Sequence, residues 1–419
     1  MRRMFVVYEV LLYLVFLLAL PFFLVTGFLR GKYLSNFPER IGFYRTPPAA
    51  HDLWIHAVSV GETLASRPVV DELLRRRPGT SIVFTTTTIT GQTQARRLFP
   101  EATVTYFPFD FSTSVRRFLD HHRPRVFAAM ETEIWPNVTR LSRARGLRLV
   151  LANGRLSDRS YPRYRAFRPI VRRILRQYDR VLARDEGDRR RFLAIGAEAV
   201  EVTGNVKFDF TPDDKPLPIA SRLEALIAGR RVLVLGSTRE GEEEAIVPEL
   251  QRFLEEENAF AILAPRKPEQ FEIVAALLTT TSIPFIRRSE LDVEPVLQPA
   301  LFLLDTVGEL SRIYRYATVA FLGGSLVPTG GHNPIEPAAA GVPVCFGPHM
   351  TNFREIAATF LENDAAVEVR SASDLMAFAR RMFHDEAARR GYAERALRTV
   401  EQNRGAAART AERIVELMA

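Results

Sequence analysis

Short apolar segments alternate with amphipathic segments along most of this 419-residue chain. In the first half, apolar segments rich in β-branched and aromatic residues occur at 53–57, 81–86, 104–107, 125–130, 147–152, 180–183 and 200–202. The intervening segments at 63–76, 90–98, 112–121 and 135–145 have helical character. Strand–helix alternation at this spacing predicts a parallel sheet that is covered by helices on both faces.

The alternation is interrupted at residues 209–218, where DFTPDDKPLP contains three prolines and three aspartates, and we predict a linker there. It resumes with strand-like segments at 231–235, 259–263, 300–304, 319–322 and 342–346, and residues 372–418 are helical in character. Because the chain is too long for one ordinary core, we expect an α/β protein of two Rossmann-like domains. The predicted domains are residues 36–208 and 219–419.

The N-terminal run at 5–28 carries a single charge, on Glu9, and is long enough to cross a bilayer. We therefore predict that residues 1–35 form one N-terminal membrane-anchor helix. Both flanks are basic, so they do not orient the run, and no cleavable signal peptide is evident. Pro21 permits a kink, which leaves a hairpin in the membrane interface as an alternative.

The formal charge of +8 and the pI of about 9.8 suit a phosphorylated substrate or an anionic membrane surface. Zinc-ligand spacings, aromatic RNA-binding strands and concentrated basic tails are missing from the sequence, so we expect no nucleic-acid partner. The single cysteine, Cys345, excludes an intrachain disulfide. Its apolar surroundings, VPVCF, indicate a core residue in a reducing compartment.

A glycine-rich stretch at residues 323–341, GGSLVPTGGHNPIEPAAAG, joins a strand-like segment to a predicted helix. One interpretation is a ligand loop, with a phosphate at the helix start and Glu336 accepting hydrogen bonds from sugar hydroxyls. The other is a turn with Asn333 as the N-cap, Pro334 at the first helical position and Glu336 facing the helix dipole. The chain has no GxxxxGK[ST] sequence, which argues against ATP hydrolysis by that route.

Two carboxylates follow strand-like segments of the first half. Glu62 lies where a helix begins after residues 53–57, so it suits a general base bordering a crevice. With Ser59 it also fits a capping box, and the residues alone leave both interpretations open. Glu131 follows the segment at 126–130, and Glu133 lies two residues further on; the pair could bind a metal or cap the next helix. Because there is no Asp-x-Asp pair, we expect no metal.

Seven motifs in a shared order resemble the 3-deoxy-D-manno-octulosonic acid (Kdo) transferases that act on lipid A precursors. They are HAVSVGE (56–62), METEIWPN (130–137), GNVKFD (204–209), GSTREGEEE (236–244), APRKPEQ (264–270), DTVGEL (305–310) and GGHNPIEP (330–337). The resemblance covers nearly the whole chain. It implies a membrane-anchored, inverting glycosyltransferase with two Rossmann-like domains in the GT-B arrangement.

The resemblance also implies roles for individual residues. Glu62 matches the catalytic base, and Glu131 and Lys207 match groups that stabilise the transition state. The donor implied is CMP-Kdo, with no metal and no cofactor. The residues that match the donor-binding positions are Ser237, Pro265, Arg266, Gly308, Glu309, Leu310, Asn333, Pro334, Ile335 and Glu336.

The expected function is transfer of Kdo from CMP-Kdo to a lipid A precursor in lipopolysaccharide core biosynthesis. We expect the chain at the inner (cytoplasmic) membrane, with its catalytic domains facing the cytoplasm. One alternative is a GT-B transferase that uses a UDP-sugar on another lipid acceptor. Another is a membrane-tethered binding protein that has lost its catalytic activity.

Overall fold

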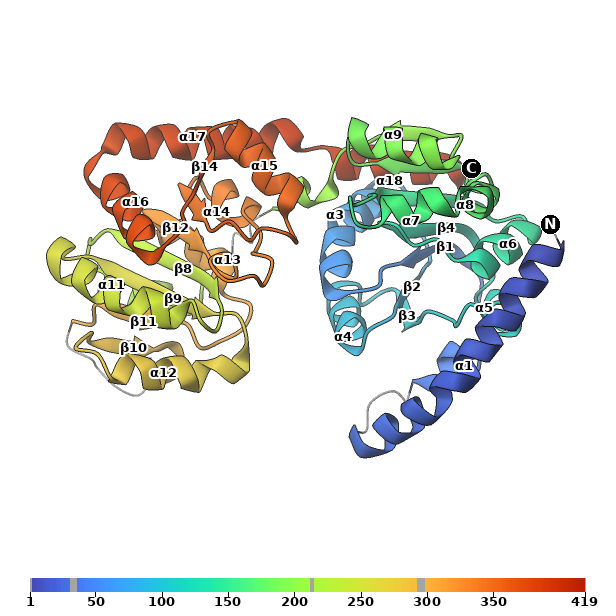
Figure 1. Cartoon of the computed structure of the whole chain (residues 1–419), viewed down its shortest axis with the longest axis horizontal. Helices are drawn as coiled ribbons and strands as arrows, with labels where there is room; N and C mark the ends of the chain where they lie inside the picture. Colours follow the sequence, from blue (N-terminus) through green and yellow to red (C-terminus); the bar gives the residue numbers. More distant parts are fainter. Residues whose placement is uncertain (1, 31–35, 212–214, 292–297, 419) are drawn as a thin grey trace. The chain divides into compact units, whose positions relative to one another are not determined.

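The computed structural model describes residues 2–30, 36–211, 215–291 and 298–418. The chain forms two compact α/β units (Figure 1). Unit 1 comprises Met1–Asp209 and Arg404–Ala419, and unit 2 comprises Phe210–Asn403. Each unit is built on a parallel sheet of seven strands, which confirms the predicted pair of α/β domains. The junction falls at the predicted linker, of which residues 212–214 lie outside the described residues.

The sheet of unit 1 has the strand order β3-β2-β1-β4-β5-β6-β7. Its strands are β1 (His51–His56), β2 (Ile82–Thr86), β3 (Thr103–Tyr106), β4 (Pro124–Met130), β5 (Arg148–Gly154), β6 (Arg180–Ala183) and β7 (Val200–Val202). Its helices are α1 (Arg2–Arg30), α2 (Phe37–Arg40), α3 (Val60–Arg76), α4 (Ile89–Leu98), α5 (Ser112–His122), α6 (Pro136–Ala144), α7 (Tyr161–Ala166), α8 (Arg168–Leu175), α9 (Glu186–Ile195), the 3₁₀ turn η1 (Val206–Asp209) and α18 (Ala406–Leu417).

Alternate side chains of β1 enter two different hydrophobic cores of unit 1. Leu53 and Ile55 pack on the side of the sheet where α3, α4 and α18 contribute apolar residues. Trp54 packs on the other side, with apolar residues of α5, α6 and α8. This period of two explains why a strand covered on both faces has an almost continuous apolar sequence.

Unit 2 repeats the arrangement with the strand order β10-β11-β9-β8-β12-β13-β14. Its strands are β8 (Val232–Thr238), β9 (Phe260–Pro265), β10 (Phe285–Arg287), β11 (Leu301–Leu303), β12 (Val319–Leu322), β13 (Val344–Phe346) and β14 (Ala366–Glu368). Its helices are α10 (Ala220–Ile227), α11 (Glu243–Glu257), η2 (Pro268–Gln270), α12 (Phe271–Thr279), η3 (Arg288–Glu290), α13 (Leu310–Ile313), η4 (Tyr314–Tyr316), α14 (Ile335–Ala339), α15 (Arg354–Glu362), α16 (Ala372–His384) and α17 (Glu386–Asn403). Cys345 is fully buried in β13, as expected of a core residue.

Two strands of unit 2 escaped the sequence analysis. β10 and β14 have three residues each and lie at the two edges of the sheet. An edge strand this short gives too few residues for an alternating pattern to be recognised.

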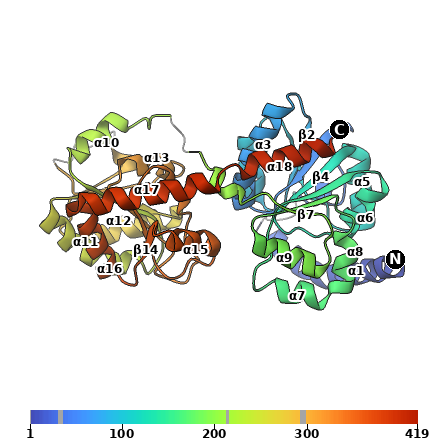
Figure 2. The same ribbon diagram turned by 90° about the horizontal axis from the view of Figure 1, so that it is seen from above.

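The last helix, α18, belongs to unit 1, although the predicted boundary placed all of residues 219–419 in the second domain. Figure 2 shows α18 lying over the strands of unit 1. Ala407, Ala411 and Ile414 are buried in the core that α3 also lines. This apolar face needs a partner, and the sheet of unit 1 provides it.

The N-terminal helix α1 corrects a second prediction, that of a membrane-crossing anchor. Among the described helices, none combines the length and the apolarity that a membrane crossing requires. The helix also has a polar side that contacts the rest of unit 1. The Tyr8 hydroxyl donates to Asp110 Oδ2 at 2.8 Å, and Glu9 accepts from Ser112 N at 2.9 Å and from Asn137 Nδ2 at 2.6 Å. The lone charge in this run is therefore a docking group.

Candidate active site

The two predicted carboxylates, Glu62 and Glu131, follow strands that are neighbours in the sheet of unit 1. Glu62 is in the first turn of α3, which follows β1, and Glu131 directly follows β4. β1 and β4 are neighbours where the strand order reverses, since the chain first builds β2 and β3 outward and then returns. In open α/β sheets, the crevice at such a switch point is where ligands bind.

The capping interpretation of Glu62 is correct as far as its hydrogen bonds go. Its Oε2 accepts from Val58 N at 2.7 Å, and its Oε1 accepts from the Ser59 hydroxyl at 3.0 Å. Ser59 Oγ in turn accepts from Glu62 N at 3.4 Å. These bonds fix the position of the carboxylate, and they leave each oxygen a further lone pair for a substrate proton.

The electrostatic surroundings of Glu62 favour a base that is active near neutral pH. Burial first, and the Glu131 carboxylate second, raise the pKa of Glu62 to about 7, against the lowering effect of Val58 N–H, Ser59 and Lys207. Desolvation and a like charge outweigh the favourable position at a helix start.

Lys207 joins the two carboxylates in unit 1. Its Nζ lies 3.4 Å from Glu131 Oε1, and both side chains are partly buried. The 3₁₀ turn η1 that carries Lys207 is held to the sheet by Asn153, whose Oδ1 accepts from Val206 N at 3.2 Å. The structure thus brings together the three predicted catalytic residues, which are 145 positions apart in the sequence at their extremes (207 − 62).

Glu131 adopts a backbone conformation that is unusual for a residue with a side chain. Its φ is 58°, in the left-handed region, while its N–H still bonds to Ala152 O at 2.8 Å. Non-glycine residues in this region carry strain, and they concentrate at functional sites. The turn directs the chain out of β4 so that the next residues lie over the strand ends.

Glu133 completes a cluster of three carboxylates, and its importance was not evident from the sequence. Burial first, with the Glu62 and Glu131 charges, raises the pKa of Glu133 to about 7, although Trp135 Nε1 donates to its Oε2 at 2.7 Å. The buried His56 Nε2 lies 3.9 Å from Glu133 Oε2 and makes no hydrogen bond with the described residues. A protonated Glu133 could donate to that nitrogen after a small side-chain movement.

In unit 2, a buried glutamate organises the glycine-rich stretch. Glu242, fully buried, accepts hydrogen bonds from the backbone N–H groups of Gly324 at 2.5 Å and of Ser325 and Leu326 at 2.8 Å. It also accepts from Arg239 N at 3.0 Å. This carboxylate therefore ties the turn after β8 to the loop after β12, and β8 and β12 are again the neighbours at a switch point.

Two arginines supply positive charge beside this loop. Burial first, then the charges of Arg266 and Arg239, lower the pKa of His332 to about 3, which places both guanidinium groups near the neutral imidazole. Neither arginine side chain forms an ion pair or hydrogen bond with a residue in the described ranges. Guanidinium groups with free N–H donors beside a glycine-rich loop suit a phosphate. The sequence analysis identified Arg266 but missed Arg239, which lies two residues after Ser237.

The predicted helix start contributes less than expected. α14 begins at Ile335, two residues after Asn333, and is five residues long, so its dipole is small. Asn333 forms a turn in which its Oδ1 accepts from Ile335 N at 3.2 Å, and its Nδ2 lies 3.5 Å from Glu336 Oε1. Burial raises the pKa of Glu336, while Asn333 and Arg266 oppose the rise.

The remaining predicted donor residues lie at neighbouring strand ends of the same sheet. Ser237 is the second-to-last residue of β8 and Pro265 is the last residue of β9, and Ser237 has a left-handed φ of 59°. Pro334 and Ile335 are buried. Gly323 is required there, because a Cβ would lie 2.6 Å from Ser237 O.

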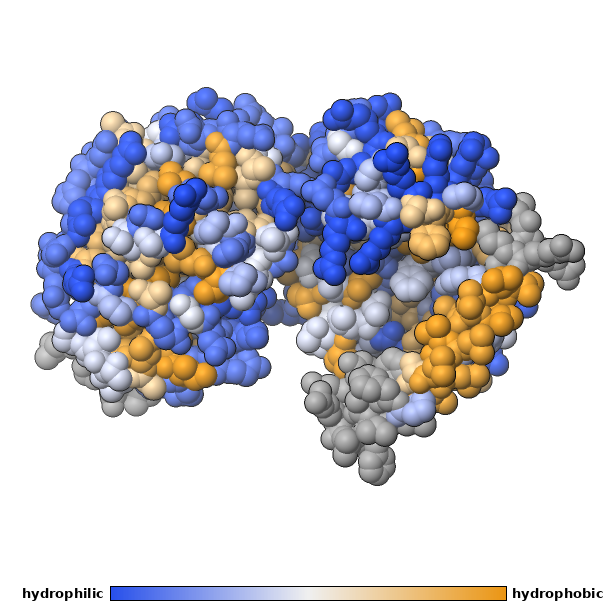
Figure 3. Space-filling view, viewed as in Figure 1, coloured by the Kyte–Doolittle hydropathy of each residue, from blue (hydrophilic) through white to orange (hydrophobic). Residues whose placement is uncertain are grey.

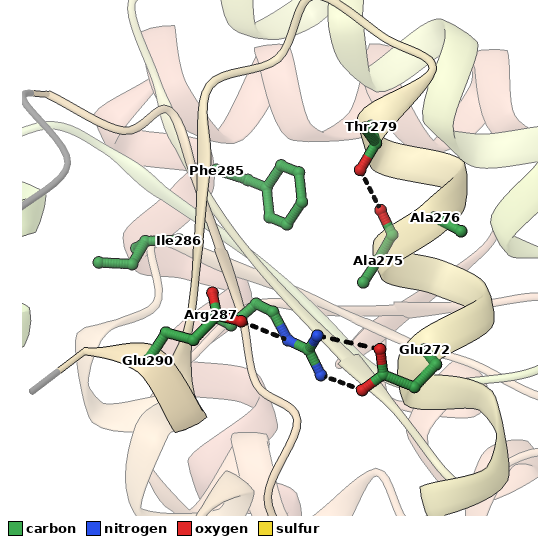
Figure 4. A pocket seen from close by; sticks show the side chains of 8 residues that line it. All are labelled: Glu272, Ala275, Ala276, Thr279, Phe285, Ile286, Arg287 and Glu290. Atoms are coloured by element: carbon green, nitrogen blue, oxygen red, sulfur yellow. Dashed lines mark hydrogen bonds and ion pairs between the residues drawn. The ribbon is translucent and has the colours of Figure 1, made fainter. Parts of the chain in front are cut away.

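The DTVGEL segment is held by two arginines, Arg287 at the end of β10 and Arg288 directly after it. Arg287 Nε donates to Asp305 Oδ2 at 2.9 Å, and Arg288 Nε donates to Glu309 Oε2 at 3.2 Å. Figure 4 shows Arg287 also facing Glu272 across a groove of about 370 Å³. Since the Glu309 carboxylate is engaged by Arg288, a ligand would meet mainly the exposed backbone at Gly308 and the neighbouring Leu310.

Comparison with known proteins agrees with this arrangement. Residues 35–210 match the family described as 3-Deoxy-D-manno-octulosonic-acid transferase (kdotransferase). The 3-deoxy-D-manno-octulosonic acid transferase of Haemophilus influenzae is 36% identical over 352 residues, which cover 82% of each chain. That of Bordetella pertussis is 35% identical over 381 residues, 88% of each chain. This chain belongs to the Kdo transferase family.

A solved structure supports the fold class of the family member. A glycosyltransferase from Rickettsia africae has a TM-score of 0.57 at 12% identity, with 88% of this chain and 98% of that chain covered. At this identity the likeness shows the fold alone, a GT-B-like pair of parallel-sheet domains.

We predict that Glu242→Gln destabilises this Kdo transferase by about 1–3 kcal/mol, because an amide offers one acceptor oxygen and turns an NH₂ group toward backbone donors. Urea unfolding monitored by circular dichroism measures the change. Glu240→Gln, an exposed substitution in the same turn, is the control and should have no measurable effect. Equal stability of the two variants would contradict the role given to Glu242.

Proposed function

We propose that this family member transfers Kdo from CMP-Kdo to a hydroxyl group of a lipid A precursor, with inversion at the anomeric carbon. The observation that carries the proposal is the cluster of Glu62, Glu131 and Lys207 in unit 1. It holds a carboxylate with a pKa of about 7 beside a second carboxylate and a cation. Such a group is ionised often enough at neutral pH to accept a proton, and it is basic enough to keep it.

In the proposed reaction, the acceptor hydroxyl oxygen attacks the anomeric carbon of the donor as its proton passes to Glu62. The bond from that carbon to the phosphate oxygen breaks, and CMP leaves with the electron pair. Arg239 and Arg266 stabilise the leaving phosphate, which replaces the work that a metal ion does in other transferases. Lys207 is suited to the donor's carboxylate, and Glu131 keeps that lysine in place.

The proposed attachment to the inner membrane is through the surface of α1, with the helix lying in the membrane interface. The exposed face of α1 carries large apolar side chains. They are Val6, Val7, Val10, Leu11, Tyr13, Leu14, Val15, Leu17 and Leu18, and they are 40–83% exposed. Figure 3 shows them as one continuous apolar strip. An apolar patch of this extent on an otherwise polar surface is characteristic of membrane or partner contact.

The direct test of the function uses the purified full-length chain with a lipid A precursor in detergent. Freshly prepared CMP-Kdo and a panel of UDP-sugars are supplied in parallel, and products are identified by mass spectrometry. We expect the acceptor mass to increase by Kdo units with release of CMP. Transfer from a UDP-sugar alone, or no transfer from any donor, would exclude the proposed reaction.

We predict that Glu62→Gln lowers kcat by about 10²–10⁴-fold, while the melting temperature and the affinity for CMP stay nearly constant. Glutamine preserves the contacts to Val58 and Ser59 but cannot accept the proton. In the wild type, kcat should rise with pH up to about 7 and then level off, because protonation inactivates the base. Glu131→Gln should shift this midpoint to lower pH, since it removes the like charge.

Ser59→Ala is the matched control for the cap. It should reduce stability by about 0.5–2 kcal/mol and change kcat far less than Glu62→Gln does. Near-normal turnover in Glu62→Gln would show that Glu62 is a helix cap and not the general base.

We also predict that Arg266→Gln and Arg239→Gln each weaken CMP binding by about 1.5–3 kcal/mol, the usual value of a hydrogen bond to a charged group. Isothermal titration with CMP and with cytidine separates the two parts of the ligand. The variants should lose affinity for CMP but retain their weaker affinity for cytidine, which has no phosphate. An equal loss for both ligands would place the arginines on the nucleoside instead.

For the membrane surface, we predict that the pair Val15→Ser and Leu18→Gln lowers partition onto phosphatidylcholine vesicles at least about 10-fold. The two side chains are 64% and 83% exposed, so the change should leave the fold intact. Ile273→Gln, a substitution at an equally exposed apolar position in unit 2, is the control. Vesicle flotation that is unchanged by the pair would rule out attachment through α1.

A further inference from the structure

A groove of about 560 Å³ lies between α1, α5 and α6 of unit 1. Three arginines line it: Arg116 from α5, and Arg140 and Arg143 from α6. Phe5 and Val6 of α1 line it from the other side, together with Glu9. None of these residues belongs to the candidate catalytic cluster or to the predicted donor site.

The positive charge in this groove is only partly neutralised. Arg143 pairs with Asp179 at 2.9 Å, but the exposed side chain of Arg116 makes no hydrogen bond or ion pair with the described residues. Arg140 donates to Ser112 Oγ and to Asn137 Oδ1, both at 3.2 Å, while its buried Nε–H has no partner in the described part of the chain. Burial first, and the nearby Arg116 charge second, lower the pKa of Arg140.

The carboxylate of Glu9 is directed toward the helix starts. Its Oε1 accepts from Ser112 N at 2.9 Å, and its Oε2 accepts from Ser112 Oγ at 2.8 Å and Asn137 Nδ2 at 2.6 Å. Three donors of α5 and α6 therefore engage this carboxylate. The groove is left with an unpaired guanidinium and an unsatisfied N–H donor, and both would be satisfied by an anion with several acceptor oxygens.

The position of the groove indicates where such an anion comes from. Val6 lines the groove and also belongs to the exposed apolar strip of α1. A lipid whose acyl chains pack against that strip would bring its headgroup to the same edge of the helix. The Phe5 ring, 4.9 Å from the Arg140 guanidinium carbon, already covers part of that arginine's apolar surface.

We propose that the groove between α1, α5 and α6 binds the phosphodiester of an anionic phospholipid of the membrane on which α1 rests. Arg116 and Arg140 form the phosphate contacts, and Val6 and the apolar strip contact the acyl chains. This inference rests on the proposed membrane attachment through α1. The occupant is a bilayer lipid, and the acceptor of the transfer reaction is a separate molecule.

The experiment compares flotation of the full-length protein with vesicles of phosphatidylcholine alone and with mixed phosphatidylcholine–phosphatidylglycerol vesicles. The wild type should bind the mixed vesicles more tightly. Arg116→Gln should reduce that preference about fivefold, the usual effect of one basic residue near an anionic surface, and leave binding to pure phosphatidylcholine unchanged. Arg125→Gln is the matched control, because Arg125 is 64% exposed and lies at the start of β4, outside the groove.

Three results would overturn the inference. An Arg116→Gln preference equal to that of the wild type would show that the groove does not bind the headgroup. An equal loss in Arg125→Gln would show diffuse attraction by the basic surface instead of a site. Undiminished preference together with a raised KM for detergent-dispersed acceptor would assign the groove to the acceptor's phosphate.

The test also separates failure of this inference from failure of the proposed function. Binding to phosphatidylcholine reports the apolar strip, the preference for phosphatidylglycerol reports the groove, and neither depends on turnover.

Discussion

The arrangement in unit 1 depends on the repulsion between Glu62 and Glu131 and on the cation that limits it. Burial first, and the Glu131 carboxylate second, raise the proton affinity of Glu62. Lys207, 3.4 Å from Glu131 Oε1, limits this rise because its positive charge favours the ionised form of Glu62. The hydrogen bonds from Val58 and Ser59 then hold Glu62 without fully compensating its burial. The Glu62 carboxylate is thus both a member of a capping box and the candidate general base.

Both units use the same topological device for different chemistry. In each sheet, the strand order reverses between two neighbouring strands, which are β1 and β4 in unit 1 and β8 and β12 in unit 2. In unit 1 the segments after these strands carry acids, and in unit 2 they carry Arg239 and a glycine-rich backbone. Glu242 allows the glycine-rich loop to keep its form without a ligand, because it satisfies three consecutive N–H groups from within.

The sequence was sufficient for features that follow from a repeated pattern. Most of the strands, and the positions of Glu62 and Glu131 after strand ends, followed from alternation and parallel pairing, whereas the switch point required the strand order of the structure. Lys207 came only from the family resemblance. Features that depend on a single contact between distant segments could not be predicted. Glu9 looked like a lone charge in a membrane span until its partners 103 and 128 residues away were placed beside it. The surroundings of Glu133 could not be predicted for the same reason, because they include His56, which lies at the end of β1.

Glu62 titrates near neutrality because of burial and of Glu131, and this titration can be measured without any substrate. The protein is labelled with ¹³C at glutamate side-chain carboxyl carbons, and the Glu62 resonance is assigned by its loss in Glu62→Gln. Its chemical shift is then followed across pH. We expect a midpoint near pH 7. A midpoint near 4.5, the ordinary value for a glutamate, would contradict it.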